Sequence, residues 1–138
     1  MALPTLSTPT YELTVPSTKK KIKYRPFLVK EEKVLLLALE SEDDKEIADA
    51  MKGLIKACVL TKGIDPDELA TFDVEYIFLN IRGKSIGEDI DVKMVCPDDG
   101  TTEITTKIPI DKIKVRFTKG HTNQIQISDD LWVEMKYP

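Results

Sequence analysis

Histidine occurs once in this sequence and cysteine twice, so the side chains that most often carry catalysis or bind zinc are scarce. His121 lies in a Lys-Gly-His-Thr turn, where a lone histidine is usually a surface residue. Structural zinc needs about four nitrogen or sulfur ligands, more than the chain holds. No serine stands in a Gly-x-Ser-x-Gly elbow, and neither cysteine has a histidine nearby in sequence. We therefore expect that the protein is not an enzyme and that it binds no metal ion and no cofactor.

Two local patterns come closest to a ligand site, and both are incomplete. The segment Cys96-Pro97-Asp98-Asp99-Gly100 would supply half of a zinc ribbon, but the second cysteine is missing. Its aspartates lack the twelve-residue calcium loop with a closing glutamate. A plain hairpin turn is the expected structure. The glycines never cluster after a strand, which excludes a phosphate-cradling loop.

The sequence also has no run approaching the ~20 apolar residues that span a bilayer, and no basic N-terminal region followed by an apolar one. We expect no membrane partner and no signal peptide. Cys58 and Cys96 have no framework spacing, which favours a reducing cytosol over a disulfide-linked secreted domain.

Charge and composition describe a chain that folds in water. Of its 138 residues, 41% are hydrophobic and 32% charged, and the formal net charge is −4. An acidic molecule repels nucleic acid unless its lysines gather on one face. Lys19-Lys20-Lys21-x-Lys23 is such a gathering, and a solvated hairpin explains it better than a phosphate clamp does. We expect no nucleic acid partner.

The first half of the chain predicts a hairpin and three helices. Residues 1–9 are expected to form a flexible N-terminal arm, because they hold prolines and little to bury. Alternating apolar residues on both sides of a turn at 16–19 predict a β-hairpin over 10–26. Helical periodicity then runs over 30–86. Asp43 with Glu46 resembles a capping box, Asp65-Pro66 indicates a helix start, and Asp73 is expected to cap again.

The second half has a period of two, which predicts an antiparallel β-meander over 88–137 with one apolar side. A strand is expected at 113–117 among the others. Because strands and helices are segregated, the fold class is α+β, with residues 10–138 as a single domain.

Apolar surface is the feature left for function. The helices at 31–40 and 73–82 are more apolar than a small monomer readily buries, and such surface is usually covered by a partner. Trp132 alternates with Leu131 and Val133, so its side chain leaves the core face and is either covered by another segment or touches a partner.

Longer strings carry a resemblance: KYRPFLVKEE at 23–32, ATFDVEYIFL at 70–79, IRGKSIGE at 81–88, then CPDD at 96–99 and WVEMKYP at 132–138. Together they resemble the baseplate hub subunit family of T-even-type contractile-tailed bacteriophages, nearly end to end. Members commonly continue beyond the Tyr-Pro at 137–138, which leaves open a chain shortened at its C-terminus.

The resemblance implies a structural or assembly protein of the baseplate hub that binds other hub or tail proteins, with homo-oligomerisation left open. It also implies the host cytoplasm during assembly and the tail baseplate of the virion as locations. The alternative function is a tail assembly chaperone that is absent from the mature virion.

Six residues are candidates for partner contacts. Arg82, Lys84 and Ser85 lie at a helix end in the most distinctive string, although the two cations could simply complement the helix dipole at about 0.3–1 kcal/mol each. Tyr24 and Phe27 flank the passage from hairpin to first helix, where packing is an equal alternative. Trp132 completes the set.

Overall fold

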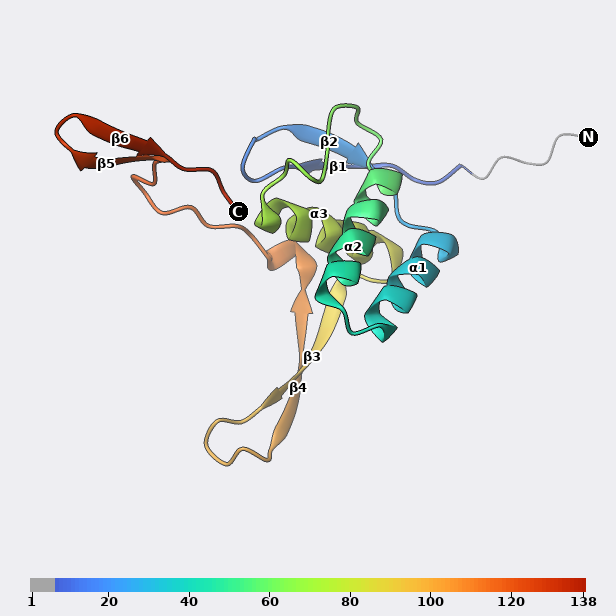
Figure 1. The fold of residues 1–138 in the computed structure, drawn as a ribbon. Coiled ribbons are helices and arrows are strands. Elements are labelled where there is room, and N and C mark those ends of the chain that lie inside the picture. The colour runs from blue at the N-terminus through green and yellow to red at the C-terminus, as the bar shows by residue number, and fades with distance from the viewer. Residues whose placement is uncertain (1–6) are drawn as a thin grey trace, which may run out of the picture.

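The computed structural model describes residues 7–138 and contains a hairpin, three helices and two further hairpins in that order (Figure 1). The elements are β1 (Tyr11–Thr14), β2 (Lys21–Tyr24), α1 (Val29–Glu40), α2 (Asp44–Cys58), α3 (Thr71–Ser85), β3 (Asp89–Val95), β4 (Glu103–Pro109), the 3-10 helix η1 (Ile110–Lys112), β5 (Gln124–Ser128) and β6 (Leu131–Glu134). The α+β class is confirmed. Of the arm expected at 1–9, residues 1–6 lie outside the described residues, and 7–9 have no regular structure.

The β1–β2 hairpin follows its sequence pattern directly. Its strands pair antiparallel, with Leu13 opposite Ile22. Successive side chains of a strand point to opposite faces. Accordingly, Ile22 and Tyr24 are buried while Lys21 and Lys23 are exposed. One face of this hairpin therefore belongs to the core and the other to solvent.

Helix α2 begins at its predicted cap and ends against the hairpin. The carboxylate of Asp43 accepts the N–H of Lys45 at 2.8 Å, which satisfies one of the free amides of the first turn. At the other end, Cys58 O accepts the Arg25 N–H at 3.0 Å, and the Leu60 N–H donates to Lys23 O at 2.8 Å. These backbone bonds hold the end of α2 beside β2.

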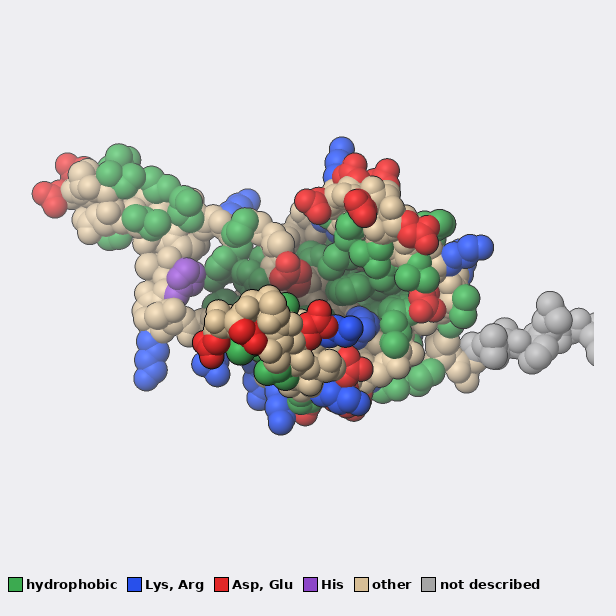
Figure 2. Space-filling model, turned by 90° about the horizontal axis from the view of Figure 1, so that it is seen from below, with side chains coloured by type: hydrophobic (Ala, Val, Ile, Leu, Met, Phe, Trp, Pro, Cys, Tyr) green, Lys and Arg blue, Asp and Glu red, His purple; other side chains and the backbone are tan. Residues whose placement is uncertain are grey.

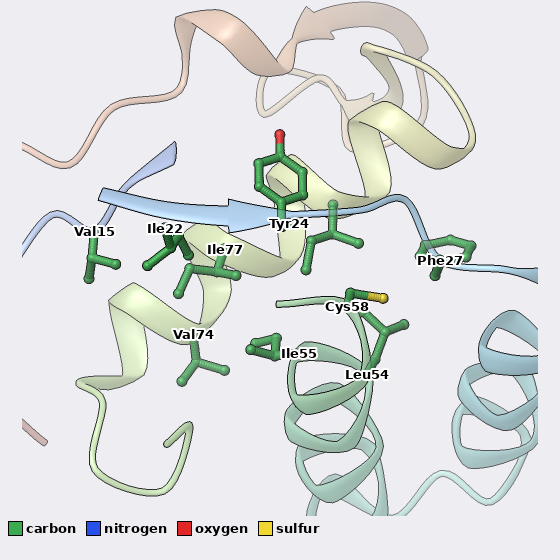
Figure 3. Packing of buried hydrophobic residues seen from close by; sticks show 10 residues of the cluster. Val15, Ile22, Tyr24, Phe27, Leu54, Ile55, Cys58, Val74 and Ile77 are labelled. Atoms are coloured by element: carbon green, nitrogen blue, oxygen red, sulfur yellow. The ribbon is translucent and has the colours of Figure 1, made fainter. Parts of the chain in front are cut away.

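The core lies between the β1–β2 hairpin, α2 and α3 (Figure 3). Its fully buried members include four isoleucines, and burying such a side chain contributes roughly 1.5–3 kcal/mol. The cluster consists of Val15, Ile22, Tyr24, Phe27, Leu54, Ile55, Cys58, Val74, Ile77 and Ile81. Helix α1 adds little to it, since Ala38 is the one residue of α1 classed as buried.

The start of the third helix differs from the sequence prediction. Asp65 does accept an N–H, from Asp67 at 3.1 Å, but the chain forms only a turn there, and α3 begins at Thr71. The prediction that Asp73 caps a helix is wrong, because Asp73 lies inside α3 and its carboxylate binds Ser17. Helix α3 ends at Ser85, one position before the predicted limit of the helical region at 86.

The C-terminal strands form two separate hairpins, β3–β4 and β5–β6, rather than one continuous sheet. Pro109 ends β4, and the next residue, Ile110, is buried against α3 beside Gly83. Residues 113–117, predicted as a strand, have no regular structure. Phe117 instead packs edge-on against Phe72, with ring centroids 6.0 Å apart. The segment between the two hairpins therefore does not continue the β-sheet, and both hairpins project from the body (Figure 1).

Candidate binding surface

The β3–β4 hairpin carries an apolar face that the described chain leaves largely open. Ile90 lies opposite Ile108 and Met94 opposite Ile104, with Val92 between them on the same face. Met94 and Ile104 are both more than half exposed. Neighbouring positions such as Asp91 and Lys107 point to the opposite, charged face. The hairpin is therefore an amphipathic ribbon whose apolar side has no cover near its tip.

The β5–β6 hairpin repeats this arrangement and is more exposed. One face carries Ile125 opposite Val133, with Leu131 two positions from Val133 on the same strand. Ile127 lies at a register irregularity of β5, and Met135 directly follows β6. All five except Val133 are at least half exposed. Hydrophobic side chains spread along this projecting hairpin at the left of Figure 2, with acidic side chains at its tip. A two-stranded hairpin is marginally stable alone, so this face would gain stability from a covering surface.

Trp132 lies on the other face of the same hairpin. Its cross-strand neighbour is Gln126, and Trp132 is 58% exposed. No segment of residues 7–138 covers it. Of the two alternatives for Trp132, a partner contact is therefore the one that this geometry favours.

Helix α1 presents a third apolar surface. Leu35 and Ala38 face inward, while Val34, Leu36, Leu37 and Leu39 are about half exposed. A groove of ≈ 280 Å³ runs between α1 and α2 and is lined in part by Val34, Gly53 and Leu54. The outer side of α1 thus carries apolar side chains that no other part of residues 7–138 covers fully.

The passage from β2 into α1 is fixed by a small polar network. Arg25 Nη2 lies 3.0 Å from Glu31 Oε1, and the other oxygen of Glu31 accepts the Leu28 N–H at 2.6 Å. The hydrogen bond from Arg25 lowers the pKa of Glu31, and the same bond raises the pKa of Arg25. Tyr24 and Phe27 are both buried beside this network. Their placement supports the packing role that the sequence left open for them.

Ser85 joins this network, whereas Arg82 and Lys84 do not. The Oγ of Ser85 accepts the Phe27 N–H at 3.0 Å and donates to Ile81 O at 2.6 Å. Lys84 is exposed, binds Glu88 and lies 5.2 Å from the Tyr11 ring centroid. Its hydrogen bond to Glu88 raises its pKa. Arg82 has a buried Nη1 with no hydrogen-bond partner within residues 7–138. The three residues therefore do not form one shared site.

A second anchor, absent from the sequence reasoning, attaches the C-terminal segment to α3. The N–H and hydroxyl of Thr71 both donate to Pro138 O, at 2.8 and 3.0 Å. Tyr137 contacts Phe72 edge-on at 5.0 Å and stacks on His121 at 5.8 Å between centroids. An open groove of ≈ 1020 Å³ lies beside this anchor. Apart from its aromatic residues, the sequence gives no signal for this anchor, because the residues in contact are far apart along the chain.

The side chains of Cys58 and Asp99, whose pKa values are strongly shifted, belong to the packing and to a turn of the fold. Burial raises the pKa of the Cys58 thiol to about 11, which makes its thiolate scarce at neutral pH. Hydrogen bonds from Thr102 and Thr101 lower the pKa of Asp99 to about 2, and they belong to the β3–β4 turn. Within residues 7–138 no His, Cys, Asp and Glu side chains group into a metal site, and no helix is both long and apolar enough to cross a membrane.

A small α+β body that presents several uncovered apolar surfaces is typical of proteins that assemble with others. Comparison with protein families indicates the assembly to which such a protein belongs. The chain belongs to the T4 bacteriophage base plate protein family, whose model matches residues 8–138. Searches of curated proteins and of solved structures found no match.

Family membership implies a place in the tail of the virion and interaction with other baseplate or tail proteins. It also suggests a structural rather than an enzymatic role. The resemblance to phage baseplate proteins is therefore confirmed at the level of the baseplate family.

Proposed function

We propose that this chain is a structural or assembly protein of the baseplate hub that works by binding other hub or tail proteins. Membership of the baseplate family supports a role in this organelle. The hub assignment rests on the strings at 23–32, 70–79 and 81–88, which resemble hub subunits.

The observation that carries the binding role is the apolar face of β5–β6. Ile125, Leu131 and Val133 share one side of a projecting hairpin, Ile127 and Met135 are exposed next to them, and all five except Val133 are at least half exposed. Covering such a face removes apolar surface from water, at about 25 cal/mol per Å². Trp132 on the opposite face adds a large aromatic of the kind that often anchors interfaces.

Co-expression with the other baseplate proteins of the same phage tests this function. The tagged chain is expected to capture at least one hub protein, and Ile125→Ser with Leu131→Ser is expected to abolish capture. Gln124→Ser is the matched control, because Gln124 neighbours Ile125 but lies on the opposite face. Capture of no tail protein by the folded chain would refute the binding role.

Mass spectrometry of purified virions then separates a hub subunit from an assembly chaperone. A subunit is present in the finished particle, whereas a chaperone is found only with assembly intermediates. The same apolar faces serve either role, so the capture experiment does not depend on this outcome.

A further inference from the structure

The fold brings together two distant segments of the chain that between them carry six cationic side chains. Lys19 and Lys20 lie in the connection from β1 to β2, Lys21 begins β2, and Lys114, Arg116 and Lys119 lie between η1 and β5. Lys19 Nζ is 4.8 Å from the Phe117 ring centroid, which holds the two segments together. Thr14 and Lys19 also line one hollow with Lys114 and Phe117. We call these six residues the basic patch.

Within residues 7–138, none of the six cations forms a salt bridge with a carboxylate. The ion pairs within residues 7–138 involve Lys23, Arg25, Lys52, Lys56, Lys84 and Lys107 instead. All six patch side chains are exposed, and Lys and Arg side chains line an edge between the projecting hairpin and the body in Figure 2. Like charges on adjacent segments repel one another, and an anionic surface would relieve that repulsion.

The opposite charge gathers on the far side of the body, where α1 meets α2. Glu40, Glu42, Asp43, Asp44 and Glu46 lie within seven positions and are all exposed, with Lys45 among them. No salt bridge within the described chain involves any of these five carboxylates. We call them the acidic corner. It is continuous with the exposed leucines at 36, 37 and 39 of α1.

Two further observations support contact between the basic patch of one molecule and the acidic corner of another. Each lies beside exposed apolar side chains: Phe117, which is 41% exposed, contacts Lys19 of the patch, and the α1 leucines adjoin the corner. The β1–β2 turn and α1 lie at opposite sides of the body, so the two surfaces of one chain cannot meet (Figure 1). They can meet only between molecules.

We propose that the basic patch of one copy binds the acidic corner and the adjoining α1 leucines of a second copy. The contact joins two different surfaces, so it is heterologous and leaves one free surface at each end of a dimer. Further copies add in the same direction, giving a ring where the rotation closes and a filament where it does not. Nucleic acid is the weaker occupant, because the net charge of −4 opposes it and the chain itself carries a matching acidic surface. This inference goes beyond the proposed hub role and does not depend on it.

Sedimentation analysis of the purified chain tests the proposal, using two neutralised variants. The first is Lys19→Gln, Lys114→Gln and Arg116→Gln. The second is Glu40→Gln, Glu42→Gln and Asp44→Asn, which spares Asp43 because Asp43 caps α2. The control for the first variant is Lys62→Gln, Lys93→Gln and Lys136→Gln, which removes the same number of positive charges at exposed positions outside the patch. Circular dichroism verifies that each variant folds.

The wild type and the control are expected to self-associate at about 50 mM salt and to dissociate toward monomer at about 500 mM salt, where charges are screened within a few Å. Each neutralised variant alone is expected to associate at least about tenfold more weakly. An equimolar mixture of the two is expected to form a 1:1 dimer that does not grow, because one intact patch and one intact corner remain.

Three results would overturn the proposal. The first is a wild type that stays monomeric at low salt, including one that binds a single-stranded oligonucleotide through the patch. The second is self-association that either neutralised variant retains unchanged. The third is a mixture that shows no heterodimer although both variants are folded. Capture of hub proteins by such a monomer would leave the proposed function standing while this inference fails.

Discussion

Ser17 donates both its backbone N–H and its hydroxyl to the carboxylate of Asp73, which joins the β1–β2 turn to the first turn of α3. The N–H lies 3.1 Å from Asp73 Oδ1, and the hydroxyl binds Oδ2. Asp73 is fully buried, so both of its oxygens need these donors. Its negative charge also lies near the positive end of the α3 dipole. One carboxylate thereby fixes the hairpin over the core.

Asp73→Ala is expected to lower the free energy of unfolding by about 1–3 kcal/mol, because it leaves the Ser17 donors without partners in a part-buried site. Denaturant unfolding followed by circular dichroism measures the change. The control is Glu75→Ala on the exposed side of the same helix, expected within about 0.5 kcal/mol of wild type. Equal losses in both variants would show that the Ser17 contact contributes nothing specific.

Acid is expected to weaken the link between β2 and α1. The hydrogen bond from Arg25 holds the pKa of Glu31 below its ordinary value of 4.5, so this pair stabilises the fold at neutral pH. That contribution is complete above the ordinary pKa and is lost as the pH falls through the lower, folded-state pKa. The stability difference between wild type and Glu31→Gln should therefore be constant near neutrality and shrink below about pH 4.5.

Unfolding at a series of pH values measures this difference. Glu32→Gln serves as the control, because Glu32 lies in the same helical turn and forms no ion pair within residues 7–138. A Glu31→Gln difference that does not change between pH 7 and the acid limit of the folded state would contradict the assigned role of the pair.

The two helix-interior glycines are expected to respond oppositely to substitution. A Cβ at Gly53 would meet nothing within 4 Å, so Gly53→Ala should stabilise α2 by up to about 1 kcal/mol through helix propensity. A Cβ at Gly83 would lie 3.0 Å from Ile110 Cδ1, so Gly83→Val should destabilise by about 1–3 kcal/mol through overpacking. Thermal unfolding compares them, and a stabilising Gly83→Val would disprove the close contact of η1 with α3.

Thiol labelling should distinguish the two cysteines. Cys58 is fully buried with a pKa of about 11, whereas Cys96 is part-exposed at the end of β3. A thiol-disulfide reagent near neutral pH is expected to modify Cys96 in the folded chain and Cys58 only after denaturant is added. Folded Cys96→Ser should therefore react negligibly. Labelling of its remaining cysteine at the rate seen in denaturant would contradict the core arrangement around Cys58.

Local sequence patterns predicted the elements whose stability is mainly local. The alternation around Ile22, the Asp43 cap and the periodicity of α2 each depend on neighbours a few residues apart. The predicted class and element order followed from them. The separate course of the two C-terminal hairpins did not, because it depends on Ile110 and Phe117 packing against α3, far away in sequence.

The candidate contact residues were predicted less well for the same reason. Tyr24 and Phe27 were candidates for partner contacts or for packing at the entry to the first helix, and both lie in the core once α2 and α3 are packed. Trp132 was placed correctly on the face away from Leu131 and Val133, since strand alternation alone determines that. The basic patch required the fold, because its two halves lie about a hundred positions apart in the sequence.

A cryo-EM map of the assembled hub, or of its assembly intermediate, tests the central claim most directly. The account predicts that the apolar face of β5–β6, from Ile125 to Met135, is covered by a neighbouring tail protein or by another copy of this chain. A map in which that face and Trp132 remain in solvent, with the chain bound through its charged surfaces alone, would contradict it.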